Sequence, residues 1–155
     1  MTRIAGAGLL FALILPLVPY ALAQPTAQDR LWDAAIAGDT TAIVTALNDG
    51  ADINALDTRR SRNGRRALNW AAWHNRVEVI AVLIEHDADL EARNLTGFTP
   101  LHHAAENGSV EALAALLEAG ADPSAANHVG RRPIDTARLR GHRHIVELLE
   151  AATAE

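Results

Sequence analysis

The sequence predicts an all-α fold, a solenoid of about four stacked helical units. Two observations predict it, a fixed repeat and a skewed composition. Gly64, Gly97 and Gly130 recur with a period of 33 residues, and a period of that length indicates stacked supersecondary units. Hydrophobic residues make up 49% of the chain but aromatic residues only 4%. Such apolar material, mostly Ala and Leu, is typical of small, closely packed helices rather than sheets.

Two further markers repeat with the glycines. A tetrapeptide of similar type follows each one: Arg66-Ala67-Leu68-Asn69, Thr99-Pro100-Leu101-His102 and Arg132-Pro133-Ile134-Asp135. A closing tripeptide comes later in each period: Gly50-Ala51-Asp52, Asp87-Ala88-Asp89 and Gly120-Ala121-Asp122. The first two closures are 37 residues apart, so four extra residues enlarge the connection between Asp57 and Gly64.

The run from Thr99 to Ala105 fits the T-P-L-H-x-A signature, and the chain thereby resembles the ankyrin-repeat family. The resemblance covers residues 29–151, in units of about 29–56, 57–93, 94–126 and 127–151, with a tail at 152–155. It implies that each unit is a β-turn, two antiparallel helices and a loop, stacked into a slightly curved slab. It also implies that His102 ties neighbouring turns together by hydrogen bonds.

The third unit makes physical sense as such a repeat. Thr99 and Pro100 suit a helix start, because a hydroxyl can cap free amides and proline fits the first helical position. Val110, Leu113, Leu116 and Leu117 recur at helical spacing and predict the apolar stripe between units. Gly120 suits the left-handed residue that ends a helix. Asp87 stands in the equivalent place and adopts that conformation only at some cost.

The first 23 residues resemble a secretory signal. Arg3 precedes an apolar stretch, and Ala21-Leu22-Ala23 has small residues at the two positions that a signal peptidase reads. We expect cleavage after Ala23, a short linker at 24–28, and a bacterial periplasmic protein whose mature form is free of the membrane. The alternative is an uncleaved membrane anchor, which Pro16 and Pro19 disfavour. The chain has no Cys, which excludes disulfides and a lipid-anchored lipoprotein.

The resemblance implies that a partner docks on one concave side, built from the turn tips and the exposed positions of each first helix. The expected partner is a protein with an acidic patch, because arginine and aromatic residues gather there, a combination typical of protein hot spots. The alternative is a solvated turn with Trp73 partly packed. The net charge of −5 argues against nucleic acid. The candidate residues are Arg59, Arg60, Arg62, Arg65, Trp73, His74, Leu95, Phe98, Glu106, Asn107, Arg131 and Arg140, and the same surface carries Val129 and Leu139.

Chemistry beyond binding finds no support in the sequence. Adjacent His102 and His103 point about 100° apart on a helix and do not readily chelate one ion. No Gly-x-Ser-x-Gly motif or phosphate-binding loop occurs in the chain. We therefore expect no enzyme, cofactor or metal site, but a monomeric, non-catalytic protein-binding module. The alternative function is an inhibitor or immunity protein that blocks an exported toxin or hydrolase.

Overall fold

A computed structural model describes residues 24–154, which contain eight α-helices and no strand. Residues 1–23, the predicted signal, lie outside the described residues. The all-α solenoid predicted from the sequence is confirmed. The helices are α1 (Ala27–Ala37), α2 (Thr40–Asn48), α3 (Ala67–Trp73), α4 (Val77–Glu85), α5 (Pro100–Asn107), α6 (Val110–Glu118), α7 (Pro133–Arg140) and α8 (Arg143–Ala152).

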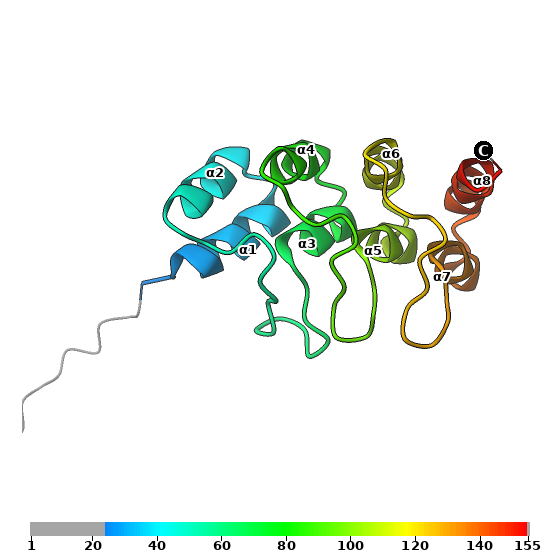
Figure 1. The fold of residues 1–155 in the computed structure, drawn as a ribbon, viewed down its shortest axis with the longest axis horizontal. Helices are drawn as coiled ribbons and strands as arrows, with labels where there is room; N and C mark the ends of the chain where they lie inside the picture. Colours follow the sequence, from blue (N-terminus) through cyan, green and yellow to red (C-terminus); the bar gives the residue numbers. More distant parts are fainter. Residues whose placement is uncertain (1–23, 155) are drawn as a thin grey trace, which may run out of the picture.

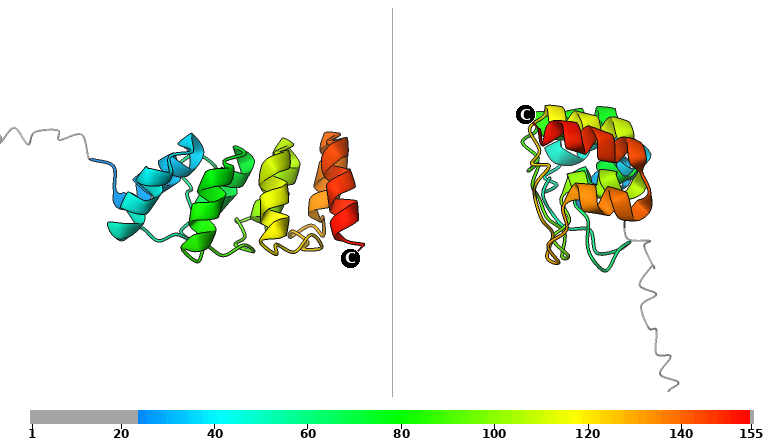
Figure 2. Two further views of the ribbon diagram at one scale, coloured as in Figure 1. Left: turned by 90° about the horizontal axis from the view of Figure 1, so that it is seen from above. Right: turned by 90° about the vertical axis from the view of Figure 1, so that its right-hand side faces the viewer.

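The helices form two layers. The first helices, α1, α3, α5 and α7, pack side by side, and the second helices, α2, α4, α6 and α8, form a parallel row (Figure 1). Long turns connect successive pairs and project beyond the first-helix row on one side of the molecule (Figure 2). Each pair therefore contacts only its neighbours in the stack, as a repeat solenoid requires.

Small and branched aliphatic side chains fill the space between successive pairs. Leu113 and Leu116 of α6 are fully buried, while Val110 and Leu117 are half-buried at the edges of the same stripe. Ala104 and Ala105 of α5 are fully buried and allow the first helices to approach closely. The predicted apolar stripe is therefore confirmed.

Side chains at the turns define where first helices begin. Thr26 and Asp29 form a reciprocal cap, so α1 starts at Ala27, inside the stretch 24–28 expected to be a linker. At α5, the Thr99 hydroxyl caps the helix and His102 Nδ1 accepts from the Thr99 amide at 3.3 Å. Asn69 accepts from the Arg66 amide in the same way at α3.

Neighbouring turns are joined by His102 and by the turn backbones. The Nε2 atom of His102 lies 2.9 Å from the Arg131 carbonyl oxygen, a hydrogen bond that links the third turn to the fourth, as the resemblance implied. The His128 amide also donates to the Thr96 carbonyl at 3.2 Å. Gly97 permits this approach, since a Cβ there would lie 2.6 Å from the His128 nitrogen.

No helix of the described region combines the length and the apolar character that crossing a membrane requires.

Candidate functional site

A buried acceptor closes each turn. Asn94 Oδ1 accepts hydrogen bonds from the amides of Thr96 and Phe98, and Asn127 Oδ1 does the same one repeat later. Asp57 occupies this position in the enlarged second turn, where its carboxylate is fully buried and accepts from the Arg59 amide. Paired backbone hydrogen bonds between Asp57 and Arg65 then close the longer loop.

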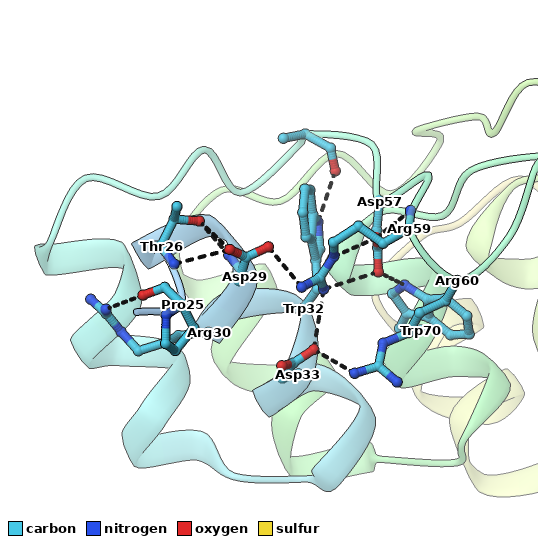
Figure 3. Close-up of polar contacts among 11 residues, drawn as sticks. Pro25, Thr26, Asp29, Arg30, Trp32, Asp33, Asp57, Arg59, Arg60 and Trp70 are labelled. Atoms are coloured by element: carbon cyan, nitrogen blue, oxygen red, sulfur yellow. Dashed lines mark hydrogen bonds and ion pairs between the residues drawn. The ribbon is translucent and has the colours of Figure 1, made fainter. Parts of the chain in front are cut away.

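Arg59 neutralises that buried charge. Its guanidinium lies 2.9 Å from Asp57, 2.7 Å from Asp29 and 3.1 Å from Asp33. It also stacks 4.7 Å from the Trp32 ring (Figure 3). The hydrogen bond to Asp57, opposed in part by burial, raises the pKa of Arg59. Arg59 therefore fastens the enlarged turn to α1, and its charge is already matched within the chain.

The other two arginines at the tip differ from each other. Arg60 pairs with Asp33 at 2.8 Å, in the same network as Arg59 (Figure 3). Arg62 is exposed and has no ion pair among residues 24–154. The sequence treated these residues as one patch, but the structure separates those that bind α1 from those that face solvent.

Arg65 is held by aromatic rings instead of by carboxylates. Its guanidinium carbon lies 4.5 Å from the Trp70 ring centroid and 4.2 Å from that of Trp73. Burial lowers the pKa of Arg65, and the nearby charge of Glu106 raises it in part. Within the described residues its side chain makes no hydrogen bond or ion pair, and its Nε is buried without an acceptor. Arg65 is a fixed cation without a counter-charge in contact.

Arg65 borders a small polar pocket of about 120 Å³. Three segments meet there: the second turn, the third turn and α5. The lining residues are Ser61, Asn63, Arg65, Asn94, Thr96, Phe98, His103 and Glu106. The predicted residues Arg65, Phe98 and Glu106 are therefore brought together around one pocket.

His103 forms the buried wall of that pocket. Its side chain is only 3% exposed, and neither ring nitrogen has a hydrogen-bond partner in the described chain. The Phe98 ring lies 5.5 Å from the His103 ring, and Trp73 approaches it edge-on at 6.0 Å. Burial, with the positive charge of Arg65 and the ring of His102, holds the pKa of His103 well below its usual value. The imidazole is therefore neutral at neutral pH.

Of the remaining first-helix candidates, Glu106 and Asn107 make contacts between units, whereas His74 packs against its own helix. Glu106 pairs with Arg140 at 2.5 Å, which joins α5 to α7. Asn107 donates to the Trp73 carbonyl at 2.8 Å. His74 stacks on Trp70, and burial, followed by the charges of Arg76 and Arg65, lowers its pKa. These side chains therefore make contacts within the chain in addition to contributing to its surface.

Three large apolar side chains are exposed, two at turn tips and one near the end of α7. Leu95 at the third turn tip is 54% exposed, Val129 at the fourth tip 74%, and Leu139 at the end of α7 66%. They are the large apolar residues that residues 24–154 leave exposed. Arg131 is exposed beside Val129, while its carbonyl binds His102.

Sequence reasoning missed His103 and Trp70 as site residues. The signal was available, because His103 follows Trp70 by one 33-residue period and precedes Glu106 by one helical turn. Because His103 is adjacent to the signature residue His102, the two were considered together, and the position of His103 in the pocket was not predicted. No group of three or more potential ligands in the described part of the chain could hold a metal ion.

Known proteins share the repeat. Residues 31–127 and 94–154 match a family model for ankyrin repeats in three copies. The chain is also 32% identical over 79 residues to the ankyrin repeat domain-containing protein 40 of Mus musculus, and equally to that of Homo sapiens. The match covers 51% of this chain and 21% of those proteins, so the chain spans about a fifth of their length.

The family model covers most of the chain, and the structure shows the stacked helix pairs and tied turns that the motif predicts. Ankyrin-repeat proteins are typically non-catalytic, and their repeats generally mediate protein–protein interaction. The chain belongs to the ankyrin-repeat family.

Proposed function

We propose that this chain is a non-catalytic module that holds a partner protein on one surface. The surface consists of the second, third and fourth turn tips (residues 58–65, 95–98 and 128–131) and the C-terminal ends of α3, α5 and α7. This surface is called the turn-tip surface below. The observation that carries the proposal is the position of Leu95, Val129 and Leu139, which all lie on it. A surface that gathers exposed apolar residues beside arginines has the composition of an interface core with a polar rim.

The charges of this surface favour an acidic partner. Arg62 and Arg131 are exposed here, and Arg65 lacks a counter-charge in contact among the described residues. Arg59 and Arg60 contribute less, because their guanidiniums already contact carboxylates of the chain. An acidic patch on the partner would therefore meet Arg62, Arg65 and Arg131 first.

The second half of the proposal is that the module works in the bacterial periplasm. Its support is the signal-like pattern of residues 1–23. Cell fractionation and intact mass of the expressed protein test it. We expect a periplasmic species beginning at Gln24, and an uncleaved chain in the cytoplasmic fraction would contradict it.

Capture from a periplasmic extract tests the binding surface. Val129→Glu places a charge at the most exposed of the three large apolar side chains, so we expect at least a tenfold loss of the captured protein. The matched control is Ala81→Glu on α4, an exposed helical residue in the second-helix row. Equal loss by both variants, or no loss by Val129→Glu, would contradict the assignment of this surface.

A further inference from the structure

Two side chains that line the pocket beside Arg65 carry buried polar atoms without hydrogen-bond partners in the described chain. Arg65 Nε and both ring nitrogens of His103 are buried without partners in the described chain. A buried polar group that lacks a partner costs about 1–3 kcal/mol. Arg65 and His103, which carry these three atoms, both line one pocket of about 120 Å³, and this arrangement points to a ligand group that binds the two side chains.

The rings around Arg65 fix where its hydrogen bonds point. Trp70 and Trp73 stack within 4.5 Å of the guanidinium, which leaves its edge as the donor side. An arginine held in this way has lost its side-chain freedom before a ligand arrives, so binding loses less entropy. The occupant is therefore expected to carry an acceptor toward the guanidinium edge.

His103 supplies a donor without adding charge. A neutral imidazole has one N–H and one acceptor nitrogen. Its Nδ1 lies 3.8 Å from the Glu106 carboxylate, beyond hydrogen-bond distance. A small acceptor in the pocket could take the imidazole N–H and the Arg65 N–H together, as a carboxylate with two oxygens does.

Charge selects among possible acceptors. Glu106 carries the negative charge of the pocket wall, but it is paired with Arg140 at 2.5 Å. The group of Arg65, Arg140 and Glu106 therefore has a net charge of +1. A single negative charge balances the group, a neutral amide leaves Arg65 uncompensated, and a doubly charged phosphate meets repulsion from Glu106.

We propose that this pocket receives one carboxylate side chain, from an Asp or Glu of the partner, bound by the Arg65 guanidinium and the His103 ring. The pocket would act as the anchor point of the turn-tip surface, where one partner residue is buried and the register of the complex is fixed. This inference rests on the proposed protein-binding function, and it adds the chemistry of a single partner residue.

The direct test uses the α-methylamide of N-acetylglutamate as the probe, whose only charge is the side-chain carboxylate, and the α-methylamide of N-acetylglutamine as its neutral match. The two are called N-acetylglutamate and N-acetylglutamine below. Titration into the ¹⁵N-labelled protein is followed through the Arg65 Nε–H and His103 ring signals. We expect saturable shifts with N-acetylglutamate and at least tenfold weaker binding of N-acetylglutamine. Equal binding of the two probes would overturn the proposal.

Three variants assign the binding to the pocket. Arg65→Gln should weaken N-acetylglutamate binding at least tenfold, whereas Glu106→Gln should strengthen it severalfold, since a repulsive charge is removed. A gain of affinity cannot come from a loss of folding. Arg143→Gln, at an exposed arginine that begins α8 in the second-helix row, is the control and should leave binding unchanged. A loss as large with Arg143→Gln as with Arg65→Gln would overturn the proposal in favour of diffuse charge attraction.

Separate experiments test the pocket and the proposed function. The probe titration tests the pocket without any partner protein, and capture from the extract tests the turn-tip surface. Capture that depends on Val129, together with no binding of N-acetylglutamate, would overturn the pocket alone. Saturable N-acetylglutamate binding at Arg65, together with capture that is indifferent to Val129→Glu, would support the pocket and overturn the turn-tip surface.

Discussion

At the scale of single residues, one change within a repeated position alters the chemistry of a whole turn. Asp57, Asn94 and Asn127 make equivalent hydrogen bonds to the amide two residues on. Only Asp57 adds a charge, and burying a charge is costly unless it is paired. Arg59 and the Trp70 Nε1–H, 3.2 Å from Asp57, supply that compensation and fasten the second turn to α1 and α3.

The buried histidines predict how stability depends on pH. Burial lowers the pKa values of His102 and His103 from a reference of 6.5. The unfolded chain therefore binds more protons than the native chain below pH 6.5. Stability is fully present above that pH and is lost as the pH falls toward the native pKa values, by up to about 1.4 kcal/mol per pH unit for each histidine.

Urea unfolding between pH 8 and pH 5.5 checks this expectation for His102. His102→Asn should flatten the decline, because asparagine does not titrate and Asn69 already fills the equivalent position. The free energy of unfolding at pH 8 serves as the control, since His102 is neutral in both states there and any difference reflects packing. An unchanged slope in His102→Asn would show that this histidine does not carry the dependence.

At the scale of elements, the loops that end helices differ in how they reach the left-handed conformation. Gly50 and Gly120 follow α2 and α6 with φ of 89° and 93°, whereas Asp87 follows α4 with φ of 62°. Asn75 also has a positive φ, of 56°, after α3. The Asn75 side chain compensates by accepting from the Ala112 amide at 2.9 Å and donating to Glu111 at 2.6 Å.

These two residues predict opposite responses to glycine. Asp87 makes no side-chain hydrogen bond in the described region, so Asp87→Gly should relieve strain and raise the free energy of unfolding by about 0.5–1 kcal/mol. Asn75→Gly relieves similar strain but removes two hydrogen bonds between units, so it should destabilise the protein. Denaturant melts of the pair decide the matter, and a stabilising Asn75→Gly would contradict the role given to its side chain.

At the scale of the whole molecule, stability comes from stacking and is unequal along the chain. The α5–α6 pair has a neighbour on both sides, whereas the α7–α8 pair at the end of the stack packs only against the one before it. In a solenoid the terminal unit can open without the rest. Leu113 and Leu149 are both fully buried but lie in these different settings.

Truncating the two leucines should therefore give different patterns of hydrogen exchange. Each leucine-to-alanine change costs about 2–5 kcal/mol of local packing. Leu149→Ala should lose amide protection in α7 and α8 and leave α3 to α6 protected. Leu113→Ala should lose protection on both sides of α6. A uniform loss in Leu149→Ala would indicate that the stack unfolds as one cooperative unit.

The sequence alone determined the frame of this protein. The 33-residue period, the caps at Thr99 and the apolar stripe through Leu113 and Leu116 are local or periodic signals, so each can be read from residues close in sequence. The same reading named Arg65, Phe98 and Glu106 as surface candidates, although without grouping them.

Only the tertiary structure decided which arginine is available for a ligand. Arg59 and Arg65 look alike in sequence, but Arg59 meets carboxylates from α1 and Arg65 meets two tryptophan rings. The pocket likewise needs two turns and α5 to come together, and His103 enters it only through that packing. Charge compensation and burial depend on neighbours that are distant in sequence, and a repeat pattern does not specify them.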